Sequence, residues 1–181
     1  GVIPIREDLT YFIAHPCHPP LFNDETTHEA RKDFFGGVHA KHDIVCALFH
    51  EPEGEYAKGE ALAKAMYAPV MESHRVTVEQ MAILEPALAE TFAATVVTAV
   101  KQAMDEAIKM GVPPKAAESF LMGHLRTEFG IIFGYAGFPF SDGAKLAIEQ
   151  AYDKIFKPDW REQIFTHKAL MHSVKQITDS L

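Results

Sequence analysis

Cysteine is scarce in this chain, whose 181 residues contain only Cys17 and Cys46. Two cysteines cannot form the framework of bridges that stabilises small secreted domains, so they favour a reducing compartment. A secretory signal is also lacking, because the sequence does not open on a basic stretch followed by an apolar one. From these two features we expect a cytoplasmic protein.

Basic clusters and long apolar runs are missing as well. The formal net charge is −8, which argues against nucleic acid or an anionic membrane surface as a partner. No apolar run reaches the roughly 20 residues that a membrane-spanning helix needs. With 48% apolar and 23% charged residues, the composition is that of an ordinary soluble globular protein.

A glycine-rich dinucleotide-binding fingerprint is absent from these residues. If the protein uses a nicotinamide cofactor, we expect a domain that precedes residue 1 to hold most of it.

Two short apolar runs near the N-terminus predict β-strands. Residues 11–13 (YFI) and 44–49 (IVCALF) are rich in β-branched and aromatic side chains. Three prolines make the HPCHPP segment at 15–20 a loop. Because two strands alone do not form a stable sheet, we interpret residues 1–52 as the trailing edge of a larger one.

Residues 53–181 have the periodicity and punctuation of helices. We expect helices over residues 55–71, 76–110, 114–133, 144–156 and 159–177. Pro86 should kink the second helix or mark a first turn. Gly111 suits the C-terminal end of that helix, and Ser141 or Asp142 can cap the fourth.

A histidine and a glutamate in the third predicted helix have the spacing of a functional pair. His124 and Glu128 lie four residues apart, so a helix places both on one face. Their neighbours are mostly apolar, which predicts a buried helix and a pair able to bind a metal or move a proton. The competing interpretation is a surface pair on an amphipathic helix.

Partners for this pair are expected in the run SHRVTVEQMAILEPALAET, which we interpret as helical. Glu85 is the preferred third metal ligand, beside His124 and Glu128, and Glu79 comes next. His74, Glu79 and Glu128 are the candidate catalytic residues. Solvent exposure of the upstream glutamates is the alternative.

Two further segments are candidate substrate-binding sites. The HPCHPP loop contributes His15 and His18, with Asn23 just beyond, and such a loop after a strand can line a ligand crevice. Adjacent Cys17 and His18 rarely serve one tetrahedral zinc site, which makes zinc a weak alternative. Ser141 and Asp142 open a helix whose N-terminus favours an anionic group, unless they form a plain N-cap.

Three phrases carry a resemblance to a known family: YFIAHPCHPPLFND, APVMESHRVTVEQMAILEPALAET and PFSDGAKLAIEQA. They resemble the C-terminal part of bacterial NAD-dependent oxidoreductases of the phosphogluconate dehydrogenase C-terminal-like, or semialdehyde dehydrogenase NAD-binding, family, which includes oxidoisomerases. More distantly, the arrangement is similar to ketol-acid reductoisomerase and 6-phosphogluconate dehydrogenase. The resemblance covers nearly the whole chain.

This resemblance implies a mainly α fold. An all-helical 6-phosphogluconate dehydrogenase C-terminal-like domain, residues 53–181, would follow the last strands of a Rossmann-type NAD(P)-binding domain, residues 1–52. Reductoisomerases carry metal-binding acids on two helices, one of which presents them four residues apart. His124 and Glu128 match that spacing, with histidine in place of one carboxylate. The upstream helix has no acidic pair at that spacing, which favours one divalent cation over two. The sugar-acid dehydrogenases use lysine and glutamate without metal, and His74 would have to replace that lysine.

The implied function is the substrate-binding and dimerisation part of an NAD(P)-dependent oxidoreductase or oxidoisomerase acting on a polyhydroxy sugar acid. The apolar runs at 92–104 and 119–133 exceed what one helical layer can cover, which predicts a homodimer. The alternative is a non-catalytic helical dimerisation module.

Overall fold

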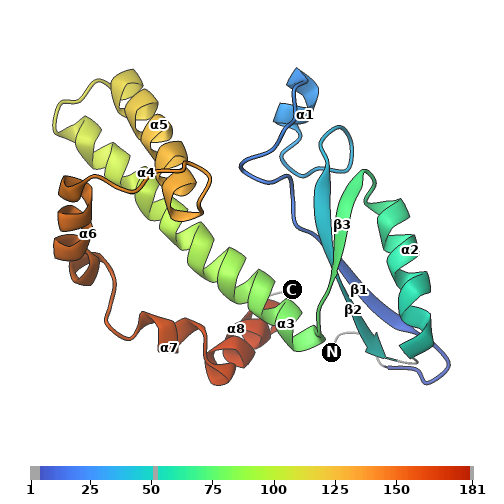
Figure 1. The fold of residues 1–181 in the computed structure, drawn as a ribbon. Coiled ribbons are helices and arrows are strands. Elements are labelled where there is room, and N and C mark those ends of the chain that lie inside the picture. The colour runs from blue at the N-terminus through green and yellow to red at the C-terminus, as the bar shows by residue number, and fades with distance from the viewer. Residues whose placement is uncertain (1–4, 51–52, 180–181) are drawn as a thin grey trace. The chain divides into compact units, whose positions relative to one another are not determined.

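The computed structural model describes residues 5–50 and 53–179. The chain divides into two compact units, here called the sheet unit (residues 1–84) and the helical unit (residues 85–181) (Figure 1). The expected fold class, mainly helical with a few strands near the N-terminus, is confirmed. The division lies at 84/85, whereas the sequence pattern suggested 52/53, because α2 and β3 pack with the first two strands.

The sheet unit is built on three strands in the order β1-β2-β3. They are β1 (Tyr11–Pro16), β2 (His42–His50) and β3 (Val70–Arg75); β1 is antiparallel to β2, and β3 is parallel to it. The helical segments of this unit are α1 (His28–Lys32), η1 (Glu53–Glu55), α2 (Tyr56–Met66) and α3 (Val78–Ala82).

Both predicted strands are confirmed, but β3 was expected to be helix. The segment VMESHR at 70–75 has no strict polar–apolar alternation, so its pattern does not identify a strand. Pairing with β2 decides its conformation, as tertiary context often does for short segments. His74 therefore lies on a strand rather than near a helix start.

One face of the sheet packs against α2 and forms the core. Ile44 and Cys46 are fully buried there with Ala63 of α2, and Phe12 packs against them. The backbone of α2 approaches this face closely: a Cβ atom on Gly59 would lie 2.4 Å from the Phe12 ring. Because side chains alternate along a strand, the residues between these core positions face the other way.

A β-bulge in β3 determines which of its side chains face the core. Between the pairs His42↔Val70 and Ile44↔Ser73, β2 advances by two residues and β3 by three. Ser73 is thereby placed on the α2 face, with its Oγ 3.6 Å from Sγ of Cys46. His74, the next residue, turns to the opposite face.

The loop between α1 and β2 is organised by Asp33. Its carboxylate accepts hydrogen bonds from four backbone N–H groups, those of residues 36, 38, 39 and 40. These bonds, those from His39 and Ala40 foremost, lower the pKa of Asp33 to about 2.

Gly36, at φ +76°, lies against the buried His42 ring, where a Cβ atom would come within 2.6 Å of Nδ1.

The helical unit is a succession of helices. They are the π-helix η2 (Ile83–Ala93), α4 (Ala94–Lys109), α5 (Pro114–Ile132), α6 (Asp142–Ile155), α7 (Trp160–Ile164) and α8 (His167–Asp179). Pro86 falls inside the π-helix, so the expected local distortion at that point is present. Gly111, at φ +102°, ends α4 as expected. The predicted final helix is divided into α7 and α8.

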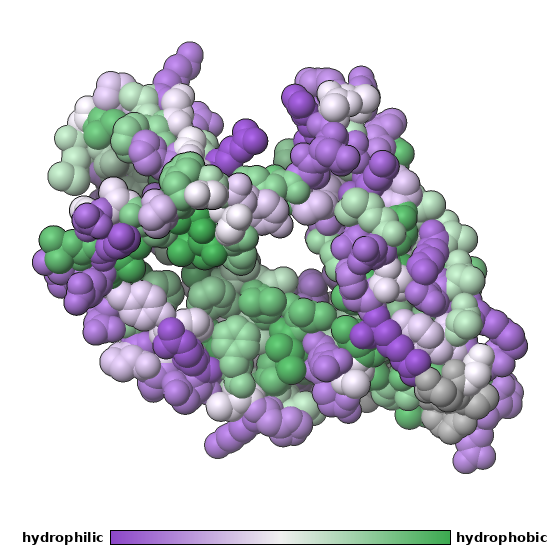
Figure 2. All heavy atoms as spheres, in the orientation of Figure 1, coloured by the Kyte–Doolittle hydropathy of each residue, from purple (hydrophilic) through white to green (hydrophobic). Residues whose placement is uncertain are grey.

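Very little of the helical unit is buried. Among its described residues, the buried ones are Ala87, Ala117, Gly130 and Leu170. α4 and α5 pack side by side (Figure 1), and Phe92 stacks on Trp160 with ring centroids 4.8 Å apart. Large apolar areas nonetheless remain on its surface (Figure 2). The expectation that α5 is mostly buried is wrong for the chain by itself, because its long apolar run faces outward.

The continuous helix Val78–Lys109 is, by length and composition, apolar enough to cross a membrane. This corrects the expectation that no run is long enough, which considered uninterrupted apolar stretches only. A helix that packs in a core or an interface has the same composition, so this feature does not by itself indicate a membrane.

Candidate functional site

A histidine–aspartate pair lies on the face of the sheet away from α2. Nε2 of His74, on β3, lies 3.0 Å from Oδ2 of Asp43, on β2. Their side chains are 47% and 30% exposed, so a small molecule can reach the pair. An ionised carboxylate only accepts hydrogen bonds, so Nε2 of His74 carries the proton.

Asp43 also connects the neighbouring strands. Its Oδ1 accepts the backbone N–H of Glu72 at 3.1 Å, and its backbone carbonyl accepts the N–H of Cys17 at 2.8 Å. Sequence reasoning missed Asp43. The signal that could have identified it is an acid directly before the apolar run at 44–49, in a strand whose alternate residues enter the core.

His15 lies in the same row of the sheet as His74. Both pair with Val45, His15 from β1 and His74 from β3, and so all three residues share the face that carries Asp43. Nδ1 of His15 donates to the carbonyl of Pro16 at 2.8 Å, which makes Nε2 the acceptor nitrogen of this ring. The structure thus groups two predicted site histidines, one catalytic and one substrate-binding, on one surface.

Cys17 directly follows β1, and its thiol is not a strong nucleophile. Burial, and next the negative charge of Asp43, raise its pKa above the ordinary value. It therefore stays protonated at neutral pH.

His18 and Asn23 shape the loop that follows β1. His18 has a left-handed backbone at φ +61°, and its Nδ1 donates to the carbonyl of Phe35 at 3.1 Å. Asn23 donates to the carbonyl of Pro20 at 2.7 Å and accepts from the N–H of Glu25. These contacts hold the loop; binding of substrate by the two side chains stays a prediction.

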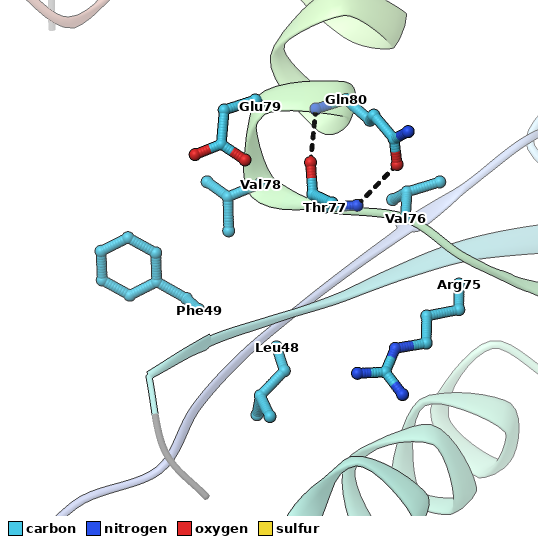
Figure 3. Close-up of a pocket in the computed structure, with 8 residues that line it drawn as sticks. All are labelled: Leu48, Phe49, Arg75, Val76, Thr77, Val78, Glu79 and Gln80. Carbon is cyan, nitrogen blue, oxygen red and sulfur yellow. Dashed lines mark hydrogen bonds between the residues drawn. The ribbon is translucent and has the colours of Figure 1, made fainter. Parts of the chain in front are cut away.

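Glu79 lies away from the sheet face that carries His74, Asp43 and His15. It lines a pocket of about 430 Å³ at the carboxyl ends of β2 and β3, with Phe49 and Arg75 (Figure 3). The capping box of Thr77 and Gln80 forms one wall of that pocket. Arg75 follows His74 in the chain and therefore faces the α2 side, where its guanidinium lies 4.2 Å from the Tyr56 ring centroid.

The predicted metal ligands of the helical unit are one turn apart, as expected, but they do not form a cluster. Nδ1 of His124 donates to the carbonyl of Phe120 at 2.8 Å, and its ring stacks on the Phe120 ring. Glu128 lines an apolar cavity of about 330 Å³ between α4, α5 and α6. Within residues 5–50 and 53–179, no three His, Cys, Asp or Glu side chains meet that could hold a metal, Glu85 included.

Ser141 and Asp142 have the geometry of an ordinary helix start. Oγ of Ser141 accepts the N–H of Ala144 at 3.2 Å, which is the expected N-cap of α6. The Asp142 carboxylate is fully exposed and pairs with Lys145 at 3.0 Å. These contacts account for both residues locally, and a substrate-binding role stays a prediction.

Comparison with known proteins gives a family match over most of the chain. Residues 23–178 match the model of the phosphogluconate dehydrogenase (decarboxylating) C-terminal family. D-apionate oxidoisomerases from Rhizobium rhizogenes and Cupriavidus necator are 49% and 47% identical to it over 178 residues. Those matches cover 98% of this chain but 64% of each relative, so the chain spans less than two thirds of their length.

Two solved structures are similar to the whole fold. A semialdehyde dehydrogenase NAD-binding protein from Cupriavidus necator, in complex with calcium and NAD, superposes with a TM-score of 0.93 at 46% identity. It matches 97% of this chain and 63% of its own. For a putative oxidoreductase from Jannaschia sp. CCS1 the TM-score is 0.85 at 47% identity, over 95% of this chain and 62% of that one.

Proposed function

Because this chain belongs to the phosphogluconate dehydrogenase (decarboxylating) C-terminal family, we propose that it is the substrate-binding and dimerisation part of an NAD(P)-dependent oxidoreductase acting on a polyhydroxy sugar acid. Relatives at 41–49% identity are D-apionate oxidoisomerases, which supports an oxidoisomerase in particular. A divalent cation and NAD accompany the C. necator neighbour.

The single observation that carries the proposal is the grouping of His74, Asp43 and His15 on one face of the sheet. An alcohol is oxidised when a base takes the hydroxyl proton while a hydride leaves the same carbon. His74 is the base in our proposal, since Asp43 both orients its ring and stabilises the imidazolium formed when the proton arrives. His15 lies across β2 and is placed to hydrogen-bond the substrate.

NAD(P), when bound, would supply the acceptor for this hydride. This chain contains no glycine-rich phosphate-binding loop, so we expect residues outside this chain to make most of the contacts with the cofactor. In this proposal the chain supplies the proton acceptor and the loop that follows β1, which the N–H of Cys17 ties to Asp43.

The predicted cation ligands do not fit a metal ion within this chain. His124 is stacked on Phe120 with Nδ1 bound to a carbonyl, and Glu128 lies among apolar side chains. We therefore derive no step through a metal, and the ligand set His124, Glu128 and Glu85 stays a prediction. For the helical unit, this arrangement favours the alternative of a structural, dimerising role.

Replacing His74 by asparagine tests the proposed base. In the complete protein that contains this chain, His74→Asn should lower kcat by about 10²- to 10⁴-fold, the usual contribution of a general base. NAD(P) affinity, measured by calorimetry, should stay the same. His28→Asn, an exposed histidine of α1, is the matched control and should keep full activity. Wild-type kcat in the His74 variant would rule out this base.

We further propose that the helical unit forms a homodimer. Val97, Phe120, Ile132 and Phe133 are each between 61% and 69% exposed in the chain. A unit that buries so few of its own residues cannot offset the entropy of ordering its helices, so another surface must cover these faces. A second copy is the occupant we propose, because it presents the same apolar helices and a two-fold pair closes the assembly.

A charge in the middle of α4 tests this assembly. Val97→Asp should convert the dimer to a monomer in light scattering and lower the helix content, since a buried, unpaired carboxylate is costly. Gln102→Asp, at an exposed polar position of the same helix, is the control and should stay dimeric. A wild-type monomer at micromolar concentration would contradict the proposal.

A further inference from the structure

We infer that Asp43 sets the tautomer of His74 and thereby makes Nδ1 the proton-accepting atom. The inference rests on the proposed role of His74 as the base and adds the atom that acts and the residue that positions it. It begins with hydrogen-bond chemistry: both oxygens of Asp43 accept, one from Nε2 of His74 and one from the N–H of Glu72. With the proton held on Nε2, the lone pair of the neutral imidazole lies on Nδ1.

The β-bulge explains how this pair is formed. The extra residue of β3 lies opposite Asp43, between the pairs at His42 and Ile44. The N–H of Glu72 is bound there by the Asp43 side chain. The same bulge turns His74 toward Asp43, because one residue fewer would turn it to the α2 core. Asp43 therefore satisfies the backbone group at the bulge and orients the histidine that the bulge exposes.

Asparagine at position 43 should reverse the tautomer without removing the contacts. Its single oxygen must accept the N–H of Glu72, since the amide nitrogen is a donor and would leave that N–H without an acceptor. The amide NH₂ then faces His74, whose Nε2 must become the acceptor. The imidazole proton moves to Nδ1, and that nitrogen can no longer accept one from the substrate.

Two measurements on the complete protein test the inference. Nitrogen-15 NMR of the histidine rings over a pH series reports which nitrogen of neutral His74 is protonated. We expect Nε2–H in the wild type and Nδ1–H in Asp43→Asn. Kinetics should show kcat lower by about 10²- to 10⁴-fold in Asp43→Asn, with KM and NAD(P) affinity close to wild type. Glu72→Gln removes an equal charge from the adjacent strand but keeps the backbone N–H, and should behave as wild type in both measurements.

The outcomes separate this inference from the proposed function. Nδ1–H in the wild type, or an unchanged tautomer in Asp43→Asn, would overturn the inference even if activity is lost. A reversed tautomer with normal kcat would instead show that His74 is not the base, which refutes the proposed function and the inference that depends on it. A reversed His74 tautomer in Asp43→Asn, together with a lowered kcat, would support both the proposed function and the inference.

Discussion

The sheet unit buries Ile44 and Cys46 completely behind one short helix, whereas the helical unit leaves Ile132 and Phe133 about two-thirds exposed. The first unit also places its polar side chains in defined pairs, as at Asp43 and His74. In the second, the candidate polar residues make local helix contacts, such as the N-cap of Ser141. The difference is what our two proposals would require, since they place the chemistry on the unit with its own core and the dimer contacts on the unit that buries few of its described residues.

Truncating one isoleucine in each unit gives the largest expected contrast. Ile44→Ala removes a fully buried side chain and should lower the free energy of unfolding by about 2–5 kcal/mol at every protein concentration. Ile132→Ala should destabilise the protein only where the dimer forms, so its effect should change with protein concentration. Urea unfolding of both variants at low and high protein concentration measures this, and a concentration-independent effect of Ile132→Ala would remove the contrast.

Alanine substitutions at two helical glycines, one in each unit, should change stability by smaller amounts, and the two changes should have opposite signs. Gly59→Ala places a Cβ atom 2.4 Å from the Phe12 ring and should destabilise the sheet unit by about 1–3 kcal/mol through overpacking. At Gly123, in α5, such a Cβ would meet no described atom within 4 Å apart from its chain neighbours and its own helix backbone, so Gly123→Ala should stabilise the helix by about 0.5–1 kcal/mol. Thermal unfolding tests both; a destabilised Gly123→Ala would place that position inside the dimer interface.

The smallest expected effect is the pH response of the Asp33 loop. The pKa of Asp33 in the folded chain is about 2, below its ordinary value of 3.8. A lowered pKa stabilises the fold above 3.8, and this contribution is lost as the pH falls toward 2. The difference in unfolding temperature between wild type and Asp33→Asn should therefore shrink over that window. Asp24→Asn, nearby on the surface, is the control, and a difference that is constant with pH would argue against this role.

Local composition was sufficient to predict much of the fold. The strands at 11–13 and 44–49 follow from β-branched and aromatic side chains, and the ends of α4 and α6 from Gly111 and Ser141. β3 was not predictable in this way, because its conformation depends on pairing with a strand far away in the sequence. The bulge that orients His74 depends on the same pairing.

The candidate site was predicted in part. His15 and His74 were identified from their residue type and setting, and the structure places them in one row of the sheet. Asp43 was missed because a single acid carries no motif until its partner strand is known. The emphasis on His124 and Glu128 came from equating an apolar helix with a buried one, although apolar residues at an unformed interface are exposed in the single chain.

The bulge in β3 has a consequence for how relatives should be aligned with this chain. Strand residues alternate between two faces, so the number of residues between Val70 and His74 determines which face of the sheet the histidine occupies. A relative with one residue fewer there would keep a histidine in the aligned column yet direct it into the core. A relative with a substitution at Met71, but the same length, would keep the histidine beside the aspartate. For transferring function across this family, a gap in these few positions is therefore more informative than the percentage of identical residues.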